Sequence, residues 1–195
     1  LAEAMRIAAS HHVRPRILCE EGHPGEKIVA GAQSQNADMI VMGAEYSRSW
    51  SNFVWESTLR YVVKNSTQDL FIVPYKTRFT GDDFLAVYGR KASSLLFLEK
   101  AVHFLSRFGG KKIIVSRPAV SRIAPPPISS NPMRADWILS HLNDSDILRH
   151  AEHANASLIL LERSQFLEKR SWMAGLKLEK LIRSSPCPVL VLPTT

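Results

Sequence analysis

A stretch of 47 residues occurs twice in this chain, at a constant offset of 119 residues and without a gap, so that residues 28–74 align with residues 147–193. Each copy has the pattern of a short helix, an apolar strand, a polar crossover, a second helix and a strand closed by proline. The same residue stands at eight aligned positions, namely Ile28 and Ile147, Ala32 and Ala151, Asn36 and Asn155, Ala37 and Ala156, Ile40 and Ile159, Leu59 and Leu178, Ser66 and Ser185, and Pro74 and Pro193. The chain therefore contains a repeated supersecondary unit.

The strands of the repeat are continuous apolar runs rather than alternating ones. The inner strands are predicted at Met39–Met42 and Leu158–Leu161, and the closing strands at Leu70–Pro74 and Val189–Pro193. Runs of this kind that alternate with helices are typical of a parallel sheet covered on both faces. We predict an α/β fold class, with two tandem open parallel-sheet domains that carry helices on both faces.

Further elements are predicted from apolar periodicity and turn residues. They are helices over residues 1–10, 56–65 and 93–108, and strands over residues 16–21, 84–88, 113–115 and 136–142. The polar stretch Tyr75–Asp83 contains Gly81 and separates the first copy from the next strand. We place the domain boundary there, which predicts domains of residues 1–80 and 81–195.

Charge limits the classes of partner. The formal net charge is +7, and the excess lies in residues 84–135, which hold nine Lys and Arg against Glu99 alone. Such a segment can attract anions or form a solvated face, and the solvated face is favoured. Its basic residues are not interleaved with an aromatic motif, so no nucleic-acid partner is expected.

The sequence has no apolar run near the roughly 20 residues that cross a bilayer, and its start lacks the order of a signal peptide. The two cysteines, Cys19 and Cys187, fall on non-equivalent positions of the repeat and read as reduced thiols rather than as a disulfide. We therefore expect a cytoplasmic localisation, which includes the cytosolic side of a membrane protein.

Catalytic motifs are absent in any convincing context, whether Ser/His/Asp, Cys/His, paired carboxylates or HExxH. His150 and His153 stand three residues apart on a predicted helix, but no third ligand has a spacing that would complete a metal site. We predict that the protein is not an enzyme, with no catalytic residues and no metal ligands.

Three segments carry a resemblance to a known family, the GHPG turn at Gly22–Gly25, the ADMIVMG strand at Ala37–Gly43 and the SPCPVLVLP segment at Ser185–Pro193. In these segments the chain resembles the universal stress protein family. Residues 1–75 look like the last two-thirds of one such domain, and residues 84–193 like a second domain. The resemblance implies a tandem form whose first domain lacks its opening strand, helix and second strand, as in a truncated chain or a fragment of a longer one.

Family members that bind ATP are similar in a loop of the form G-x-x-G, nine residues, then G-[ST], whose glycine backbone and hydroxyl reach the phosphates. The matching positions are Gly43, Tyr46, Glu56 and Ser57 in the first copy and Glu162, Gln165, Gly175 and Leu176 in the second. The resemblance thus implies a vestigial cofactor-binding loop that keeps Gly43, Ser57 and Gly175. The family's nucleotide-contacting aspartate would fall on Tyr88.

Both loops look disabled for ATP. A carboxylate at Glu56 or Glu162 would repel a phosphate, and a side chain at Tyr46 or Gln165 disfavours the backbone geometry that glycine permits. We therefore expect no cofactor, with ATP binding weakly or not at all.

The resemblance implies a non-catalytic regulatory or interaction module. Domains of this family are found fused behind cation/proton antiporters and amino-acid permeases, so a membrane-embedded transporter domain is an expected partner. The alternative left open is a stand-alone universal stress protein that binds a nucleotide. The resemblance also implies an intramolecular pseudo-dimer in which Leu70–Val73 meets Val189–Leu192, and a homodimer is a further arrangement.

Overall fold

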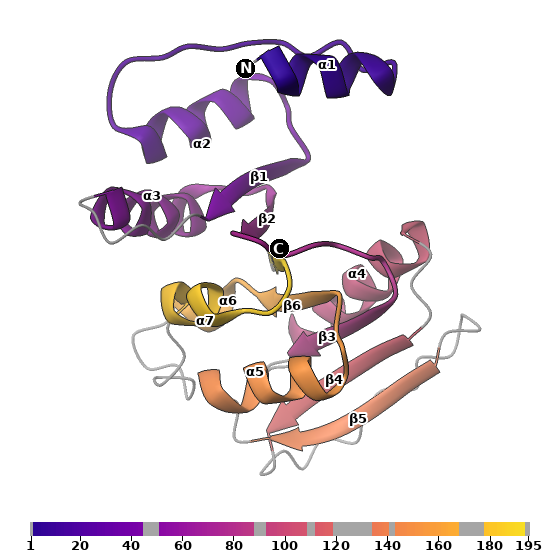
Figure 1. Cartoon of the computed structure of the whole chain (residues 1–195). Coiled ribbons are helices and arrows are strands. Elements are labelled where there is room, and N and C mark those ends of the chain that lie inside the picture. Colours follow the sequence, from indigo (N-terminus) through magenta and orange to yellow (C-terminus); the bar gives the residue numbers. More distant parts are fainter. Residues whose placement is uncertain are drawn as a thin grey trace.

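The structure of the protein is a computed structural model, which describes residues 2–44, 51–87, 93–108, 112–118, 134–140, 143–167 and 178–193. Its strands form one seven-stranded sheet in the order β1-β2-β7-β6-β3-β4-β5 (Figure 1). They are β1 Met39–Ala44, β2 Asp69–Pro74, β3 Asp83–Val87, β4 Lys112–Pro118, β5 Arg134–Ser140, β6 Leu158–Glu162 and β7 Val189–Leu192. Neighbouring strands are parallel except β2 and β7, which are antiparallel. The predicted α/β class is confirmed.

Helices cover both faces of the sheet. They are α1 Ala2–Ser10, α2 Pro24–Ser34, α3 Ser51–Asn65, α4 Ser93–Arg107, α5 Asp144–His153, α6 Ser164–Leu167 and α7 Leu178–Ser184. Side chains of α2, α3, α5 and α7 belong to one hydrophobic cluster, and those of α4 to a second. On β6, Ile159 and Leu161 join the first cluster while Leu158 and Leu160 join the second. Because side chains alternate along a strand, the two clusters lie on opposite faces.

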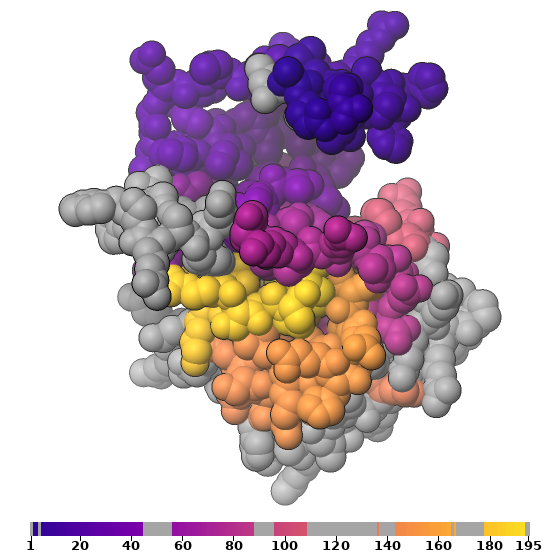
Figure 2. Space-filling view, viewed as in Figure 1, coloured from indigo at the N-terminus to yellow at the C-terminus, as the bar shows by residue number. Residues whose placement is uncertain are grey.

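The predicted strand over Arg16–Glu21 is wrong, since residues 13–21 form no helix or strand and are exposed throughout. The equivalent residues of the second copy, 135–140, belong to β5 and pair with β4. A strand needs a neighbour for its N–H and C=O groups, and no described strand runs beside residues 16–21. This part of the chain lies with α1 at the top of the molecule in Figure 2, above β1.

The sheet is joined at its centre by the closing strands of the two copies. The residues opposed in this antiparallel pair are Leu70 and Val191, Phe71 and Leu190, and Ile72 and Val189. Phe71 and Leu190 are equivalent positions, because their numbers differ by 119. In the flanking pairs, Leu70 lies opposite Val191, which is the equivalent of Ile72, and Ile72 lies opposite Val189, which is the equivalent of Leu70. An approximate two-fold axis between Phe71 and Leu190 produces this pattern. The expected contact between these two strands is confirmed, while the division into domains at residue 80 stays a prediction.

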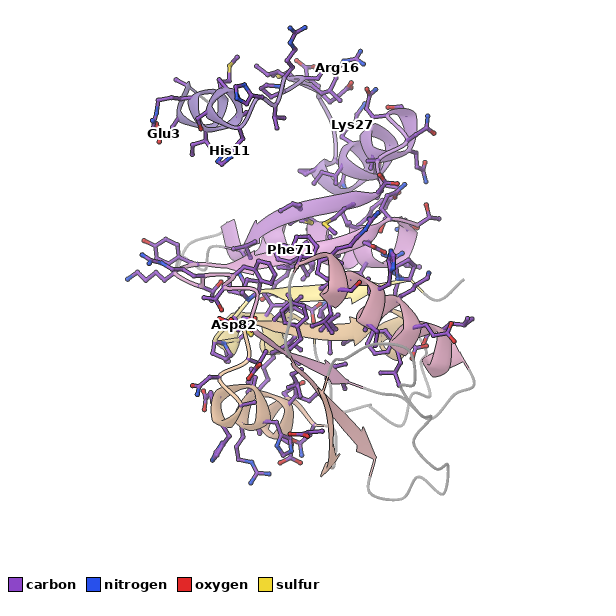
Figure 3. All side chains as sticks on the ribbon, turned by 90° about the vertical axis from the view of Figure 1, so that its right-hand side faces the viewer. Glu3, His11, Arg16, Lys27, Phe71 and Asp82 are labelled. Atoms are coloured by element: carbon purple, nitrogen blue, oxygen red, sulfur yellow. The ribbon has the colours of Figure 1, made fainter. Side chains whose placement is uncertain are left out.

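Aromatic contacts fix the segment that connects the two halves. Phe79, between β2 and β3, has its ring centroid 5.9 Å from Phe71, 5.8 Å from Phe84 and 5.6 Å from Phe108. Tilted and edge-on rings at such distances attract each other beyond their area of burial. Figure 3 shows this junction from the side, with Phe71 and Asp82 labelled. The connecting segment is therefore part of the packed structure.

In both copies an asparagine at the same position of the repeat ends a helix with the same backbone geometry. Asn36 follows α2 and Asn155 follows α5, and both have positive φ, 48° and 49°. Asparagine adopts this left-handed conformation more readily than most residues and so ends a helix. One hydrogen bond of 2.9 Å closes each turn, from the N–H of Ala37 to the carbonyl of Ala32 and from the N–H of Ala156 to the carbonyl of Ala151.

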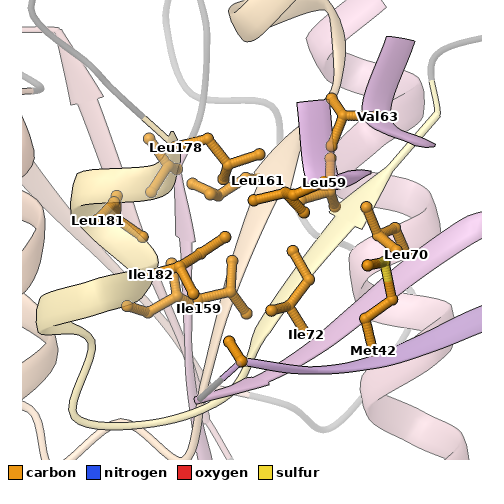
Figure 4. Packing of buried hydrophobic residues seen from close by; sticks show 14 of the residues in the cluster. Met42, Leu59, Val63, Leu70, Ile72, Ile159, Leu161, Leu178, Leu181 and Ile182 are labelled. Carbon is orange, nitrogen blue, oxygen red and sulfur yellow. The ribbon is translucent and has the colours of Figure 1, made fainter. Parts of the chain in front are cut away.

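One hydrophobic core spans the junction between the copies (Figure 4). Leu59, Leu70 and Ile72 from the first copy and Ile159 and Leu181 from the second are all 0% exposed. Burial of apolar surface stabilises a fold by roughly 25 cal/mol per Å². Separation of the two halves would expose this shared surface, so we infer that they unfold together.

Substitution of Leu59 by alanine tests this core. Leu59→Ala should lower the free energy of unfolding by about 2–5 kcal/mol, because a cavity remains where the side chain was. Leu96→Ala is the matched control, since Leu96 is 49% exposed on α4, and its effect should stay within about 0.5 kcal/mol. Urea denaturation followed by circular dichroism measures both, and equal losses would show that Leu59 is not a core residue.

Candidate functional site

Two positions that the first copy keeps from the ATP loop, Gly43 and Ser57, lie among the described residues. Gly43 lies near the carboxyl end of β1 and is exposed. A Cβ atom added to it would meet nothing within 4 Å, so packing does not require glycine there. Ser57 lies in α3 and is half-buried. Outside the described residues lie the loop positions Tyr46, Gly175 and Leu176 and the aspartate position Tyr88.

A pocket of about 420 Å³ lies beside Ser57. It is lined by His23, Glu56, Ser57, Arg60, Tyr61, Lys64 and Asn65. A neighbouring pocket of about 290 Å³ shares Glu56 and Arg60 with it and is completed by Glu179, Lys180 and Arg183. The chain neighbours Glu56 and Ser57 both line the larger pocket, and Gly43 is not among the residues that line either pocket.

Close packing of α2 against α3 shapes one wall of the larger pocket. A Cβ atom added to Gly25 would stand 2.8 Å from the Cβ of Tyr61, closer than two such atoms approach, so only glycine fits. His23 precedes α2, and its ring centroid is 5.6 Å from that of Tyr61. The GHPG segment therefore has a packing role, with Pro24 in the first turn of the helix, where its missing N–H is tolerated.

Ion pairs join α3 to α7 across the two copies. Arg60 donates to Glu179 Oε1 at 3.1 Å, and Arg183 donates to Glu56 Oε1 at 2.7 Å. From the first ion pair to the second, the residue number falls by four on α3 and rises by four on α7, so the two helices run antiparallel. Arg60 and Glu179 are equivalent positions, 119 residues apart. The arginines near the pocket are already paired with carboxylates, which weakens their attraction for a bound anion.

The second copy has a buried carboxylate where the first copy has Gly43. Glu162 ends β6, is 1% exposed and accepts a hydrogen bond of 2.7 Å from the hydroxyl of Ser164. A buried charge needs such partners, because the loss of water is otherwise very costly. The first loop position of this copy is therefore filled by a negatively charged side chain that is held in place.

The next residue, Arg163, forms hydrogen bonds between the second copy and the first. Its guanidinium donates to the carbonyls of Ser66 and Gln68, in the segment between α3 and β2, and the residue is 5% exposed. Burial lowers the pKa of Arg163, and the charge of Asp69 partly offsets this. Two charge-assisted hydrogen bonds to backbone carbonyls fix the guanidinium by its planar geometry. The end of β6 therefore serves the junction between the copies.

The described part of the chain holds no group of three or more His, Cys, Asp or Glu that could bind a metal ion. None of its helices is long and apolar enough to span a membrane. His153 Nδ1 lies 2.8 Å from the carbonyl oxygen of Arg149. Burial raises the pKa of the Cys187 thiol to about 12, so the reactive thiolate is scarce at neutral pH.

Sequence reasoning did not identify Arg163 as a structural residue. The available signal was a charged pair, Glu162 and Arg163, at the end of an apolar strand where the first copy has Gly43 and Ala44. The carbonyl partners of Arg163 are 95 and 97 residues away, and no local pattern indicates so distant a contact.

Comparison with known proteins agrees with the family resemblance. The sequence model of the Universal stress protein family matches residues 1–74, which is less than half of the chain. None of the curated proteins compared with the chain matches it.

Solved structures share the fold over nearly the whole chain. A universal stress protein from Archaeoglobus fulgidus has a TM-score of 0.76 and 18% identity, over 99% of this chain and 74% of that one. A putative universal stress protein from Pseudomonas aeruginosa has a TM-score of 0.65 and 10% identity, over 98% of this chain and 76% of that one. At these identities the likeness shows a common fold.

Replacement of Arg163 tests the junction between the copies. Arg163→Met should lower the free energy of unfolding by at least about 1.5 kcal/mol, because hydrogen bonds to charged groups contribute roughly 1.5–3 kcal/mol each. Arg149→Met is the control, since Arg149 forms an exposed pair with Asp146, a contact worth at most about 0.5 kcal/mol. Chemical denaturation of both variants measures the difference. If Arg163→Met were as stable as the native protein, the contacts of Arg163 would not stabilise the junction.

The carboxyl group of Asp69 at the start of β2 predicts a pH dependence. Burial raises its pKa above the ordinary 3.8, with Lys100 and Arg163 opposing the shift. The folded state then holds this proton more tightly than the unfolded state, so the group's contribution to stability falls as pH rises from about 3.8 through the raised pKa. Asp69→Asn removes this loss, so the stability of the variant relative to the native protein should rise between pH 4 and pH 7. An opposite trend in denaturation midpoints would contradict the shift.

Proposed function

We propose that this protein is a non-catalytic regulatory or interaction module built of two universal-stress-protein-like domains in tandem. The proposal is supported by the family match over residues 1–74, by the fold shared with universal stress proteins, and by the internal repeat. In this proposal the copies form an intramolecular pseudo-dimer through β2 and β7. The proposal includes no catalysed reaction and no required cofactor.

The buried carboxylate of Glu162 carries the proposal. It stands at the first loop position of the second copy, where its repeat partner is Gly43, and it is 1% exposed. A phosphate placed there would meet a like charge in surroundings that screen it poorly. The adjacent Arg163 is tied to Ser66 and Gln68, so the end of β6 supports contact between domains rather than the binding of a nucleotide.

We extend the proposal to a position beside a membrane transporter, on the strength of the family resemblance alone. Fractionation of cells that express the full-length gene product tests this extension. The chain should leave the membrane fraction only with detergent. Recovery in the soluble fraction without detergent would favour the stand-alone protein.

Calorimetric titration with Mg-ATP tests the loss of nucleotide binding. We expect no site tighter than about 0.1 mM, because two lost phosphate hydrogen bonds at roughly 1.5–3 kcal/mol each weaken a micromolar site by about two to four orders of magnitude. The repulsion from Glu162 acts in the same direction. The measurement needs millimolar ATP and the chain at the highest soluble concentration.

Two serine variants make this titration decisive. Ser57→Ala removes the hydroxyl that the first loop keeps, and Ser106→Ala removes a hydroxyl from the exposed side of α4 as a control. Both variants should behave as the native protein does. A dissociation constant in the low micromolar range that Ser57→Ala abolishes and Ser106→Ala preserves would contradict the proposal and favour the nucleotide-binding alternative.

A further inference from the structure

The pocket of about 420 Å³ beside α3 combines two aromatic rings with a lysine. Tyr61 on α3 is half-buried, and the ring of His23 lies 5.6 Å from the tyrosine ring at a tilt of 52°. Lys64 stands three residues after Tyr61 on α3 and lines the same pocket. Pockets of roughly 300–1,000 Å³ that join apolar walls to a few polar groups are typical of small-molecule sites.

Lys64 differs from the other cations around this pocket. Arg60 donates to Glu179, and Arg183, which is the equivalent of Lys64 in the second copy, donates to Glu56. No carboxylate of the described residues lies within ion-pair distance of the Lys64 ammonium group. An anion in the pocket therefore meets one cation from which it need not displace a carboxylate.

The tyrosine wall of the pocket is held in place by close packing. A Cβ atom added to Gly25 would stand 3.0 Å from Cγ and 3.1 Å from Cδ1 of Tyr61, so the ring lies close to the backbone of the first turn of α2. Tyr61 also packs against the larger hydrophobic cluster. A ring that is fixed before a ligand arrives loses little freedom on binding.

The second copy has no such wall at the equivalent positions. Gly25 and Tyr61 correspond to Asp144 and Lys180 at the offset of 119. The ammonium group of Lys180 lies 3.8 Å from the carboxylate of Asp144, which is 3% exposed. An ion pair thus stands where the first copy packs a glycine against a ring, so the aromatic wall is a feature of the first copy.

Most of this pocket lies away from the positions of the ATP loop. The α3 residues that line it run from Glu56 to Asn65, which is about 13 Å along a helix at 1.5 Å per residue. Glu56 and Ser57 at one end are loop positions, and Gly43 lines neither pocket. A ligand that rests on Tyr61 and Lys64 therefore does not depend on that loop.

We propose that this pocket binds a small aromatic carboxylate, with a flat ring and one carboxylate group on a short arm. The ring packs against Tyr61 and His23, and the carboxylate accepts a hydrogen bond from the ammonium group of Lys64. Residues three apart on a helix are neighbours on its surface, so Tyr61 and Lys64 can hold one ligand together. This goes beyond the proposed function, which assigns no ligand to the pocket, and it does not depend on that function.

Other ligands use fewer of these groups. A nucleoside triphosphate would bring several negative charges beside the carboxylate of Glu56, which lines the pocket. An aromatic amine would place its ammonium group beside that of Lys64. A small inorganic anion would leave both rings without a partner.

Titration of the native chain with phenylacetate tests the proposal. Amide shifts in ¹H–¹⁵N NMR spectra should be largest at His23, Tyr61 and Lys64, with a dissociation constant in the low millimolar range or tighter, as befits so small a ligand. Phenethylamine has the same ring with an ammonium group, and acetate has the carboxylate without a ring. Each should bind at least about tenfold more weakly, because each lacks one of the two contacts. Equal affinity for either control, or shifts centred elsewhere, would overturn the proposal.

Variants of Lys64 separate the proposed contact from general charge. Lys64→Met should weaken phenylacetate binding at least about fivefold, because a charge-assisted hydrogen bond is lost. Lys64→Arg should preserve the affinity, and so should Lys76→Met, which removes an exposed lysine outside the pocket. Because Lys64 is exposed, its variants should unfold at the midpoint of the native chain. Native-like affinity in Lys64→Met would overturn the proposal, and displacement of phenylacetate by micromolar Mg-ATP would assign the pocket to a nucleotide instead.

Discussion

The antiparallel pairing of β2 with β7 is the contact on which the rest of the structure depends. It is the one antiparallel pair in the described sheet, and it joins strands that lie 119 positions apart in the chain. Each strand on its own would be an apolar edge that invites association. By pairing with each other they remove both edges and bring Leu59 and Leu181 into one cluster. This pairing sets the distance between the copies. It therefore allows the ion pairs between α3 and α7 and the hydrogen bonds from Arg163 to the first copy.

The two copies differ at the positions where the loop of ATP-binding family members would begin. Gly43 and Glu162 occupy equivalent places at the ends of β1 and β6, yet one is an exposed glycine and the other a buried carboxylate. The neighbouring pair, Ala44 and Arg163, differs as much, and Arg163 holds the carbonyls of Ser66 and Gln68. The end of β6 thus contributes, through Arg163, to the contact between the two copies.

Much of the fold followed from the sequence, and the exceptions have physical causes. The apolar runs and turn residues located β1, β2, β6 and β7 to within two residues, because a buried parallel strand has a strong local signature. Arg16–Glu21 has the residues of a strand but no partner strand among the described residues, and local pattern cannot supply one. The helix α3 begins at Ser51 rather than at Glu56, because the aromatic-rich start of the helix hides its periodicity. Arg163 was missed because its partners are close only in three dimensions.

The ion pair of Arg60 with Glu179 also bears on which halves associate. These residues occupy equivalent positions and face each other beside the approximate axis. If two first halves from separate chains met through the same surface, Arg60 would oppose another Arg60, and two second halves would oppose Glu179 with Glu179. Like charges at that distance repel, while the mixed pair attracts. The exchange of Arg60 for Glu179 between the copies therefore adds a small electrostatic preference, of the order of an exposed ion pair, for the unlike halves that one chain links covalently over pairs of like halves.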